Sequence, residues 1–85
     1  MASEPVLTAA IKSRKKTFYE GPAVSISSQN ATGVFDILPK HAHFISVVRN
    51  FVKIEKANGE TENFDIKTGV LRVFDDKVDV YLTVL

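Results

Sequence analysis

The chain has 85 residues, carries 11 Lys and Arg against 10 Asp and Glu for a formal net charge of +1, and contains no cysteine. A chain of this length forms one domain around one core, and its balanced charge provides no field that would hold nucleic acid or an acidic bilayer. The lack of cysteine excludes disulfides, thiolate catalysis and Cys-ligated zinc. We therefore expect residues 1–85 to be a single domain without cofactors, and its small size favours binding over catalysis.

The first third of the chain predicts three short strands, at Val6–Ile11, Thr17–Glu20 and Ala23–Ser27. The basic run Lys12–Lys16 separates the first two strands, and we interpret it as a solvated turn rather than a site for phosphates or lipid headgroups. The apolar stretch before it is too short for a signal peptide or a membrane span. A soluble protein on the cytosolic side is expected.

The middle of the chain predicts a loop followed by a break in the sheet. Ser27–Gly33 is the longest stretch of small polar residues. After it, Pro39 lacks a backbone donor and restricts Leu38 to extended geometry, so the chain must leave its sheet there. If the apolar segment Phe35–Ile37 supplies the core, Leu38 and Pro39 lie at the rim, where exposed apolar residues often mark a docking surface.

The second half predicts two hairpins. Phe51–Lys56 and Thr61–Lys67 flank an Asn58-Gly59 pair, which favours the left-handed dihedrals of a hairpin turn. Farther on, Asp75-Asp76 separates two strand-like segments, at 70–74 and 77–84, and Gly69 is expected to break the chain between the hairpins.

These short segments together predict an all-β fold, a small antiparallel β-sandwich or flattened barrel of about eight to ten short strands. The last strand alternates cleanly, so Leu82 is expected to face the core and Thr83 the solvent. Lysines and acids on the edge strands favour a monomer in isolation.

Three sets of side chains invite a catalytic or metal-site interpretation. His41 and His43 could face one metal ion if they lay on a strand, but a third ligand is not evident. Asp75, Asp76 and Asp79 are more simply explained as a solvated turn, and Ser27 and Ser28 have no histidine that suggests a triad. We predict no metal site and no catalytic residue, and for His41 either a hydrogen bond within its loop or a contact with a partner.

One segment resembles a known family. Gly33–Ala42 reads Gly-Val-Phe-Asp-Ile-Leu-Pro-Lys-His-Ala, and seven of these ten residues match the Gly-Glu-Phe-Gly-Ile-Leu-Pro-Gly-His-Ala segment of ATP synthase epsilon subunits. Tyr19-Glu20-Gly21 before it, and the Asn-Gly pair, Gly69-Val70-Leu71 and the Asp-Asp turn after it, follow the same order as in that family. The chain departs from the family pattern at Val34, where an acid is usual, and at Asp36 and Asn50, where glycine is usual.

The resemblance implies a non-catalytic central-stalk component of a proton-driven ATP synthase, which binds the gamma subunit and the c-ring and helps couple rotation to ATP synthesis. It would lie peripherally on the cytoplasmic side of the bacterial inner membrane and touch that membrane only through the complex. The resemblance implies a c-ring side formed by Asn30, Ala31, Thr32, Gly33 and Val34, and a gamma side formed by Leu38, Pro39, His41, Ala42 and His43. Epsilon subunits continue into two regulatory helices that these 85 residues do not contain, so we expect no inhibition of ATP hydrolysis.

Two other functions remain open at this point. The altered loop and the absent helices also suit a free-standing β-sandwich interaction module that derives from the family but acts outside the synthase. A small metal- or sugar-binding enzyme is the third possibility, and loss of turnover in His41 or His43 variants would be its signature.

Overall fold

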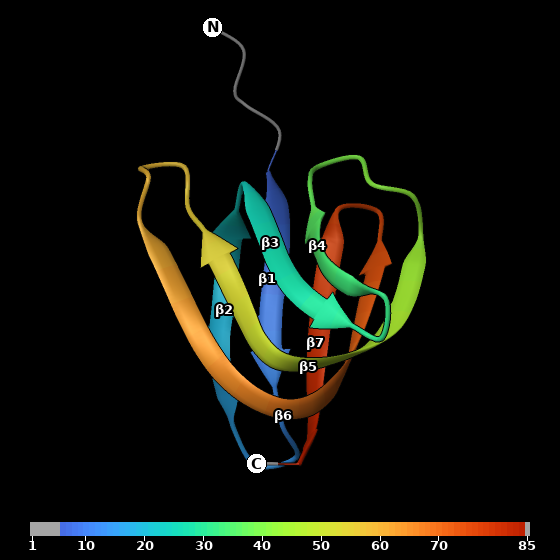
Figure 1. Cartoon of the computed structure of the whole chain (residues 1–85). Coiled ribbons are helices and arrows are strands. Elements are labelled where there is room, and N and C mark those ends of the chain that lie inside the picture. The colour runs from blue at the N-terminus through green and yellow to red at the C-terminus, as the bar shows by residue number, and fades with distance from the viewer. Residues whose placement is uncertain (1–5, 85) are drawn as a thin grey trace, which may run out of the picture.

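The computed structural model describes residues 6–84, which form seven strands and no helix, as the all-β prediction requires (Figure 1). The strands are β1 (Leu7–Lys12), β2 (Thr17–Ala23), β3 (Ser25–Asn30), β4 (Gly33–Ile37), β5 (Phe44–Glu55), β6 (Thr61–Phe74) and β7 (Lys77–Val84). Seven strands replace the expected eight to ten because β5 and β6 are long, and β6 continues through the point where we predicted a break. Gly69 lies inside β6 and does not separate two hairpins.

The strands form one sheet in the order β2-β1-β7-β6-β5-β3-β4. All neighbours are antiparallel except β1 and β7, which pair in parallel from Thr8↔Lys77 to Lys12↔Tyr81. The sheet is therefore mixed, whereas the sequence predicted antiparallel strands alone. A parallel pair needs a long connection, and here the whole of β2 to β6 supplies it.

Strands β5 and β6 curve through both layers of the sandwich, as Figure 1 shows at the bottom of the view. Strand β3 pairs with the second half of β5, and β7 pairs with the second half of β6, so each long strand has one half in each layer. The register shifts at Arg49/Asn50 in β5 and at Thr68/Gly69 in β6, and Asn50 has a positive φ of 75°. Bulges of this kind bend a strand, which lets one sheet fold over on itself.

The core fills the space between the two layers. Its buried side chains come from every strand and are almost all aliphatic: Leu7, Ala9, Ile11, Ala23, Ile26, Ile37, Val48, Val52, Ile54, Leu71, Val73, Val78, Val80 and Leu82. Alternate residues of β7 are buried, which confirms the predicted inward side for Leu82 and the exposed position of Thr83. Full burial of a side chain of this size stabilises the fold by roughly 1.5–3 kcal/mol before entropy is counted.

Both predicted hairpin turns are confirmed. Asp75 and Asp76 have positive φ values of 48° and 61°, the conformation that a two-residue type I′ turn requires. In the other turn Gly59 has a φ of 91°, and the Asn58 side chain accepts a hydrogen bond from the backbone N–H of Glu60 at 2.9 Å. The basic run also forms a turn, since the Ser13 N–H donates to the carbonyl of Lys16 at 2.7 Å.

The predicted loop over Ser27–Gly33 is wrong for its first four residues, which belong to β3. Ser28 is fully buried and donates to the carbonyl of Phe51 at 2.7 Å, while Ser27 donates to the Asp36 carboxylate at 2.5 Å. Small polar side chains usually favour loops, but these two find partners on the neighbouring strands. Only Ala31 and Thr32 remain as the turn between β3 and β4.

Candidate partner-binding surface

The turn between β3 and β4 is short and held by one side chain. The Asn30 carboxamide oxygen accepts from the backbone N–H of Thr32 at 2.9 Å and from its hydroxyl at 2.7 Å, and the amide nitrogen donates to the Ser46 hydroxyl at 3.2 Å. Gly33 follows with a φ of 133°, a conformation that disfavours other residues. Val34, the first apolar residue after the turn, is 66% exposed. The five residues predicted as the c-ring side therefore form a fixed tip without charge, which is exposed at Ala31, Thr32 and Val34.

The segment Leu38–His43 leaves the sheet, as Pro39 predicted, and is not a strand. It is tied to the β6–β7 turn, because the Lys40 N–H donates to the Asp76 carboxylate at 2.6 Å. Within the segment, the His41 N–H donates a second hydrogen bond to the carbonyl of Leu38 at 3.2 Å. Leu38 itself is 56% exposed, while Phe35 and Ile37 pack in the core as expected. The predicted gamma-side residues thus form a fixed loop with one exposed apolar side chain.

The two histidines of this loop point to different neighbours. The His41 ring packs against Phe44 at a centroid distance of 5.7 Å, and its Nδ1 lies 2.8 Å from the carbonyl of Ala42. The His43 ring packs on Phe74 at 4.5 Å, and its Nε2 lies 3.5 Å from the Asp75 carboxylate. Among residues 6–84 no group of three His, Cys, Asp or Glu side chains could hold a metal ion. The geometry therefore offers no support for the metal interpretation of this pair.

A second exposed feature was not predicted from the sequence. Ile45, Val47, Val70 and Tyr81 are exposed by 68%, 66%, 36% and 49%, although all lie on strands. Val47 pairs with Val70, and Val70 with Tyr81, so these side chains form a row across β5, β6 and β7 with Ile45 two residues away. We call these four residues the apolar strip. The segment at 44–48 indicates such a feature in the sequence, because residues on both sides of this strand are largely apolar, and only one side can face the core.

The apolar strip and the loop belong to one surface. Phe74, which is 51% exposed, lies on the same side of β6 as Val70, four residues away, and His43 stacks on it. Arg72 lies between them and pairs with Asp79 at 3.5 Å. The surface therefore combines apolar side chains with one exposed ion pair and a rigid loop at its end.

The outer face of the other layer has the opposite character. Asp36, Ser27, Lys53 and Asn63 pair across β4, β3, β5 and β6 and form a row of polar side chains. Exposed apolar groups are commonly concentrated where a partner docks, whereas a polar sheet face is stable in water. The face with the apolar strip is therefore the better candidate for docking along its strands.

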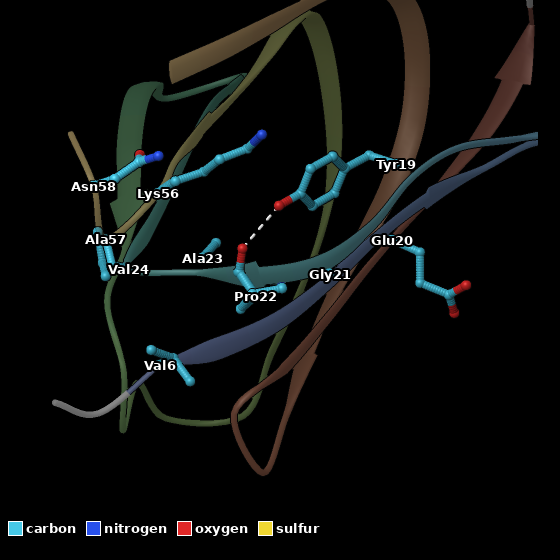
Figure 2. Close-up of a pocket in the computed structure, with 10 residues that line it drawn as sticks. All are labelled: Val6, Tyr19, Glu20, Gly21, Pro22, Ala23, Val24, Lys56, Ala57 and Asn58. Atoms are coloured by element: carbon cyan, nitrogen blue, oxygen red, sulfur yellow. Dashed lines mark hydrogen bonds between the residues drawn. The ribbon is translucent and has the colours of Figure 1, made fainter. Parts of the chain in front are cut away.

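A hollow of about 480 Å³ lies at the end of the sandwich, beside the turn at 57–60 (Figure 2). Val6, Pro22, Val24 and Ala57 form part of its wall, and Tyr19 and Lys56 supply polar groups. The Tyr19 hydroxyl and the Lys56 ammonium already have partners, which argues against a reactive site.

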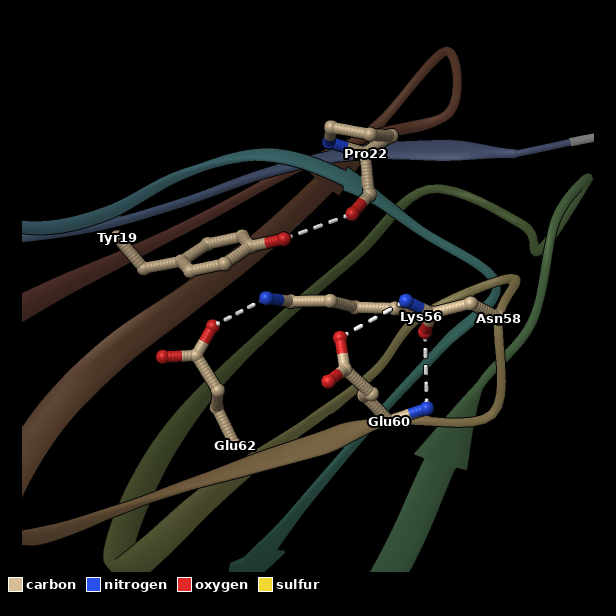
Figure 3. Close-up of polar contacts among 6 residues, drawn as sticks. All are labelled: Tyr19, Pro22, Lys56, Asn58, Glu60 and Glu62. Atoms are coloured by element: carbon tan, nitrogen blue, oxygen red, sulfur yellow. Dashed lines mark hydrogen bonds and ion pairs between the residues drawn. The ribbon is translucent and has the colours of Figure 1, made fainter.

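Figure 3 shows these contacts: the Tyr19 hydroxyl donates to the carbonyl of Pro22 at 2.8 Å, and the Lys56 ammonium lies 2.8 Å from the Glu62 carboxylate. The hydrogen bond to Glu62 raises the pKa of Lys56 above its usual value of 10.5. Lys56 also lies 5.7 Å from the centre of the Tyr19 ring. A protonated lysine held in this way is a structural cation and neither a nucleophile nor a base at neutral pH.

Within residues 6–84 there is no helix of the length and hydropathy needed to cross a membrane.

Comparison with known proteins identifies the family. The family model described as "ATP synthase, Delta/Epsilon chain, beta-sandwich domain" matches residues 6–83. The ATP synthase epsilon chain of Wolinella succinogenes is 32% identical over 65 residues, which cover 75% of this chain and 50% of that protein.

Two solved structures share the fold. A chain of the Euglena gracilis mitochondrial ATP synthase (OSCP/F1/c-ring) superimposes with a TM-score of 0.86 at 15% identity, over 96% of this chain and 53% of that one. A chain of the Tetrahymena thermophila mitochondrial ATP synthase (central stalk and c-ring) has a TM-score of 0.72 at 14% identity, over 89% and 62%. The chain therefore spans about half the length of the relatives that it matches. On the match of the family model over residues 6–83, the chain belongs to the family of ATP synthase delta/epsilon-chain β-sandwich domains.

Proposed function

We propose that this chain is the sandwich part of an epsilon subunit in the central stalk of a proton-driven ATP synthase, where it binds the gamma subunit and the c-ring. Its role is mechanical, since it helps to fix the foot of the shaft to the ring so that rotation of the ring is coupled to ATP synthesis. None of its residues performs chemistry, and it needs no cofactor. The observation that carries the proposal is the apolar strip, which is continuous with the fixed loop Leu38–His43 on one face of the sandwich.

The gamma subunit would cover this face. Leu38 and the strip supply exposed apolar area, and His41 and His43 supply polar groups at the rim, the arrangement typical of protein interfaces. The bond from the Lys40 N–H to Asp76 holds the loop in place before binding. A loop that is already ordered costs less entropy to dock, which raises affinity.

The c-ring would meet the tip formed by Asn30 to Val34. The support is the exposure of Ala31 and Thr32 in the turn and the 66% exposure of Val34. The family usually carries an acid at the Val34 position, so this contact would rely on apolar packing and backbone groups instead. By this proposal the protein sits peripherally on the cytoplasmic side of an energy-transducing membrane and is monomeric when isolated.

The proposal is tested by measuring the affinity for the gamma subunit of the same organism. Leu38→Ala and His41→Ala are expected to weaken binding by at least about 1 kcal/mol each, roughly a fivefold change in Kd. Lys53→Ala, on the polar face, serves as the control and should leave the affinity unchanged, and circular dichroism checks that each variant is folded. Unchanged affinity in both loop variants would place the gamma contact elsewhere.

A separate measurement addresses the ring. Val34→Asp places a charge at the tip and is expected to change affinity for the assembled c-ring without changing affinity for gamma. If ring binding is the same with valine and aspartate, the assignment of the tip to the c-ring is wrong.

A further inference from the structure

The first half of β5 has a free edge. β5 pairs with β6 along its whole length, but β3 pairs with β5 only over Arg49–Glu55. Among the residues that the structure describes, Phe44–Val48 therefore has a strand on one side only, and Figure 1 shows this yellow-green half of β5 at the margin of the sheet. Backbone groups of a strand point alternately to its two sides, so this edge presents N–H and C=O groups without strand partners.

Contacts near this edge leave the backbone largely available. Asn30 reaches the Ser46 hydroxyl at 3.2 Å, and that hydroxyl lies 3.2 Å from the carbonyl of Val47. Ser46 pairs with the buried Leu71, so its side chain points to the inner side of the sheet. Neither contact places a chain segment along the edge.

Three other free edges carry features that discourage pairing. The outer edge of β2 contains Glu20 and Pro22, and β4 contains Asp36. The free half of β6, Thr61–Lys67, carries charges at three of its seven positions. Natural sheets use charges and prolines in this way to prevent association. Phe44–Val48 has no charge, no proline and no shift in register.

The exposed side chains of this edge are apolar, since Ile45 and Val47 are 68% and 66% exposed. We propose that an extended strand of the gamma subunit adds to the sheet alongside Phe44–Val48, in addition to any packing on the apolar strip. This inference rests on the proposed function for the identity of the partner. The added strand would be uncharged and would carry alternating apolar residues that pack over Ile45 and Val47.

A strand fits this edge better than a helix does. The backbone groups of a helix are bonded within the helix, so a helix would cover the edge without supplying donors and acceptors to it. An added strand supplies backbone hydrogen bonds, while pockets between alternate side chains give selectivity. Because Phe44–Val48 carries no charge, charged residues on the partner strand would find no ion-pair partner along this edge.

Amide hydrogen exchange on the whole chain, with and without the gamma subunit of the same organism, tests the inference. In the free protein the amides of Phe44–Val48 that face away from β6 should exchange rapidly, and gamma should slow them by at least about tenfold. Amides on the outer edge of β2 are the internal control and should not change.

The possible outcomes separate the added strand from the proposed function. Tight gamma binding without protection of Phe44–Val48 would overturn the added strand but leave the proposed function standing. Failure to bind gamma at all would overturn both. Protection that appears at high protein concentration without gamma would show that a second copy of this chain occupies the edge, which also overturns the inference.

A pair of variants separates backbone pairing from side-chain packing. Val47→Lys should weaken gamma binding by about tenfold or more, because charges on edges oppose strand addition. Val47→Thr keeps a β-branched strand former at an uncharged edge and should weaken binding by less than about threefold. If threonine is as harmful as lysine, the apolar side chain alone carries the contact and the added strand is wrong.

Discussion

Replacing Leu82 by alanine is expected to lower the free energy of unfolding by about 2–3 kcal/mol. The side chain is 7% exposed and belongs to the core, but it also lines a hollow of about 480 Å³ between the layers, together with Ile11, Phe18 and Phe64. Because this hollow is open to solvent, water and neighbouring side chains can fill the space that the substitution leaves. The cost should therefore fall in the lower part of the range of about 2–5 kcal/mol for buried leucines. Leu71 is fully buried, so Leu71→Ala should cost more, about 3–5 kcal/mol.

Urea unfolding followed by circular dichroism measures these differences, with Thr83→Ala as the matched control on the same strand. Thr83 is exposed, and its hydroxyl lies 2.7 Å from that of Thr68, so its loss should cost less than about 1 kcal/mol. A larger loss for Thr83→Ala than for Leu82→Ala would mean that the register of β7 is shifted by one residue. Equal losses for Leu82 and Leu71 would mean that the hollow is closed in solution.

Three further predictions follow from other parts of the molecule. Gly69→Ala should destabilise the fold by about 1–3 kcal/mol, because the new Cβ would lie 3.0 Å from the Tyr81 carbonyl oxygen, and an unchanged urea midpoint would contradict this contact. The chain alone should neither hydrolyse ATP nor inhibit hydrolysis by a matching catalytic hexamer, and suppression at saturating amounts would refute this expectation. Because the pKa of Lys56 is raised in the folded state, its bond to Glu62 stabilises fully below pH 10.5 and is lost as the pH rises through the raised pKa. Glu62→Gln should reduce this alkaline loss of stability in pH-dependent thermal unfolding, and an identical pH profile would argue against the pairing.

The features predicted correctly from the sequence are those that neighbouring residues determine. The Asn58-Gly59 and Asp75-Asp76 turns follow from residue types that tolerate positive φ, and the alternation in β7 follows from a period of two. The departure of the chain at Pro39 is likewise a local consequence of a missing N–H and a fixed φ. Resemblance to a family added the partner assignment, which composition and periodicity did not provide.

The features that were missed depend on residues far apart in the sequence. Ser27 and Ser28 belong to a strand because Asp36 and Phe51 accept their hydrogen bonds, and nothing near them in the sequence shows this. The parallel pairing of β1 with β7, and the continuity of β6 through Gly69, also emerge only when the sheet is assembled. The apolar strip was missed because an exposed and a buried valine look the same until the register is known.

The position of β7 between β1 and β6 has a consequence for how the protein is made. The β1–β2 hairpin pairs with the rest of the sheet only through β7, so the first two strands of the sandwich are held in place by its seventh. During synthesis the hairpin therefore has no strand partner in the rest of the sheet until β7 has left the ribosome. Pairings between distant segments also close slowly, because the entropy of a long loop is lost before the contact forms. The sandwich is therefore expected to complete its fold only after β7 has emerged, in a step of milliseconds to seconds that pairs β1 with β7.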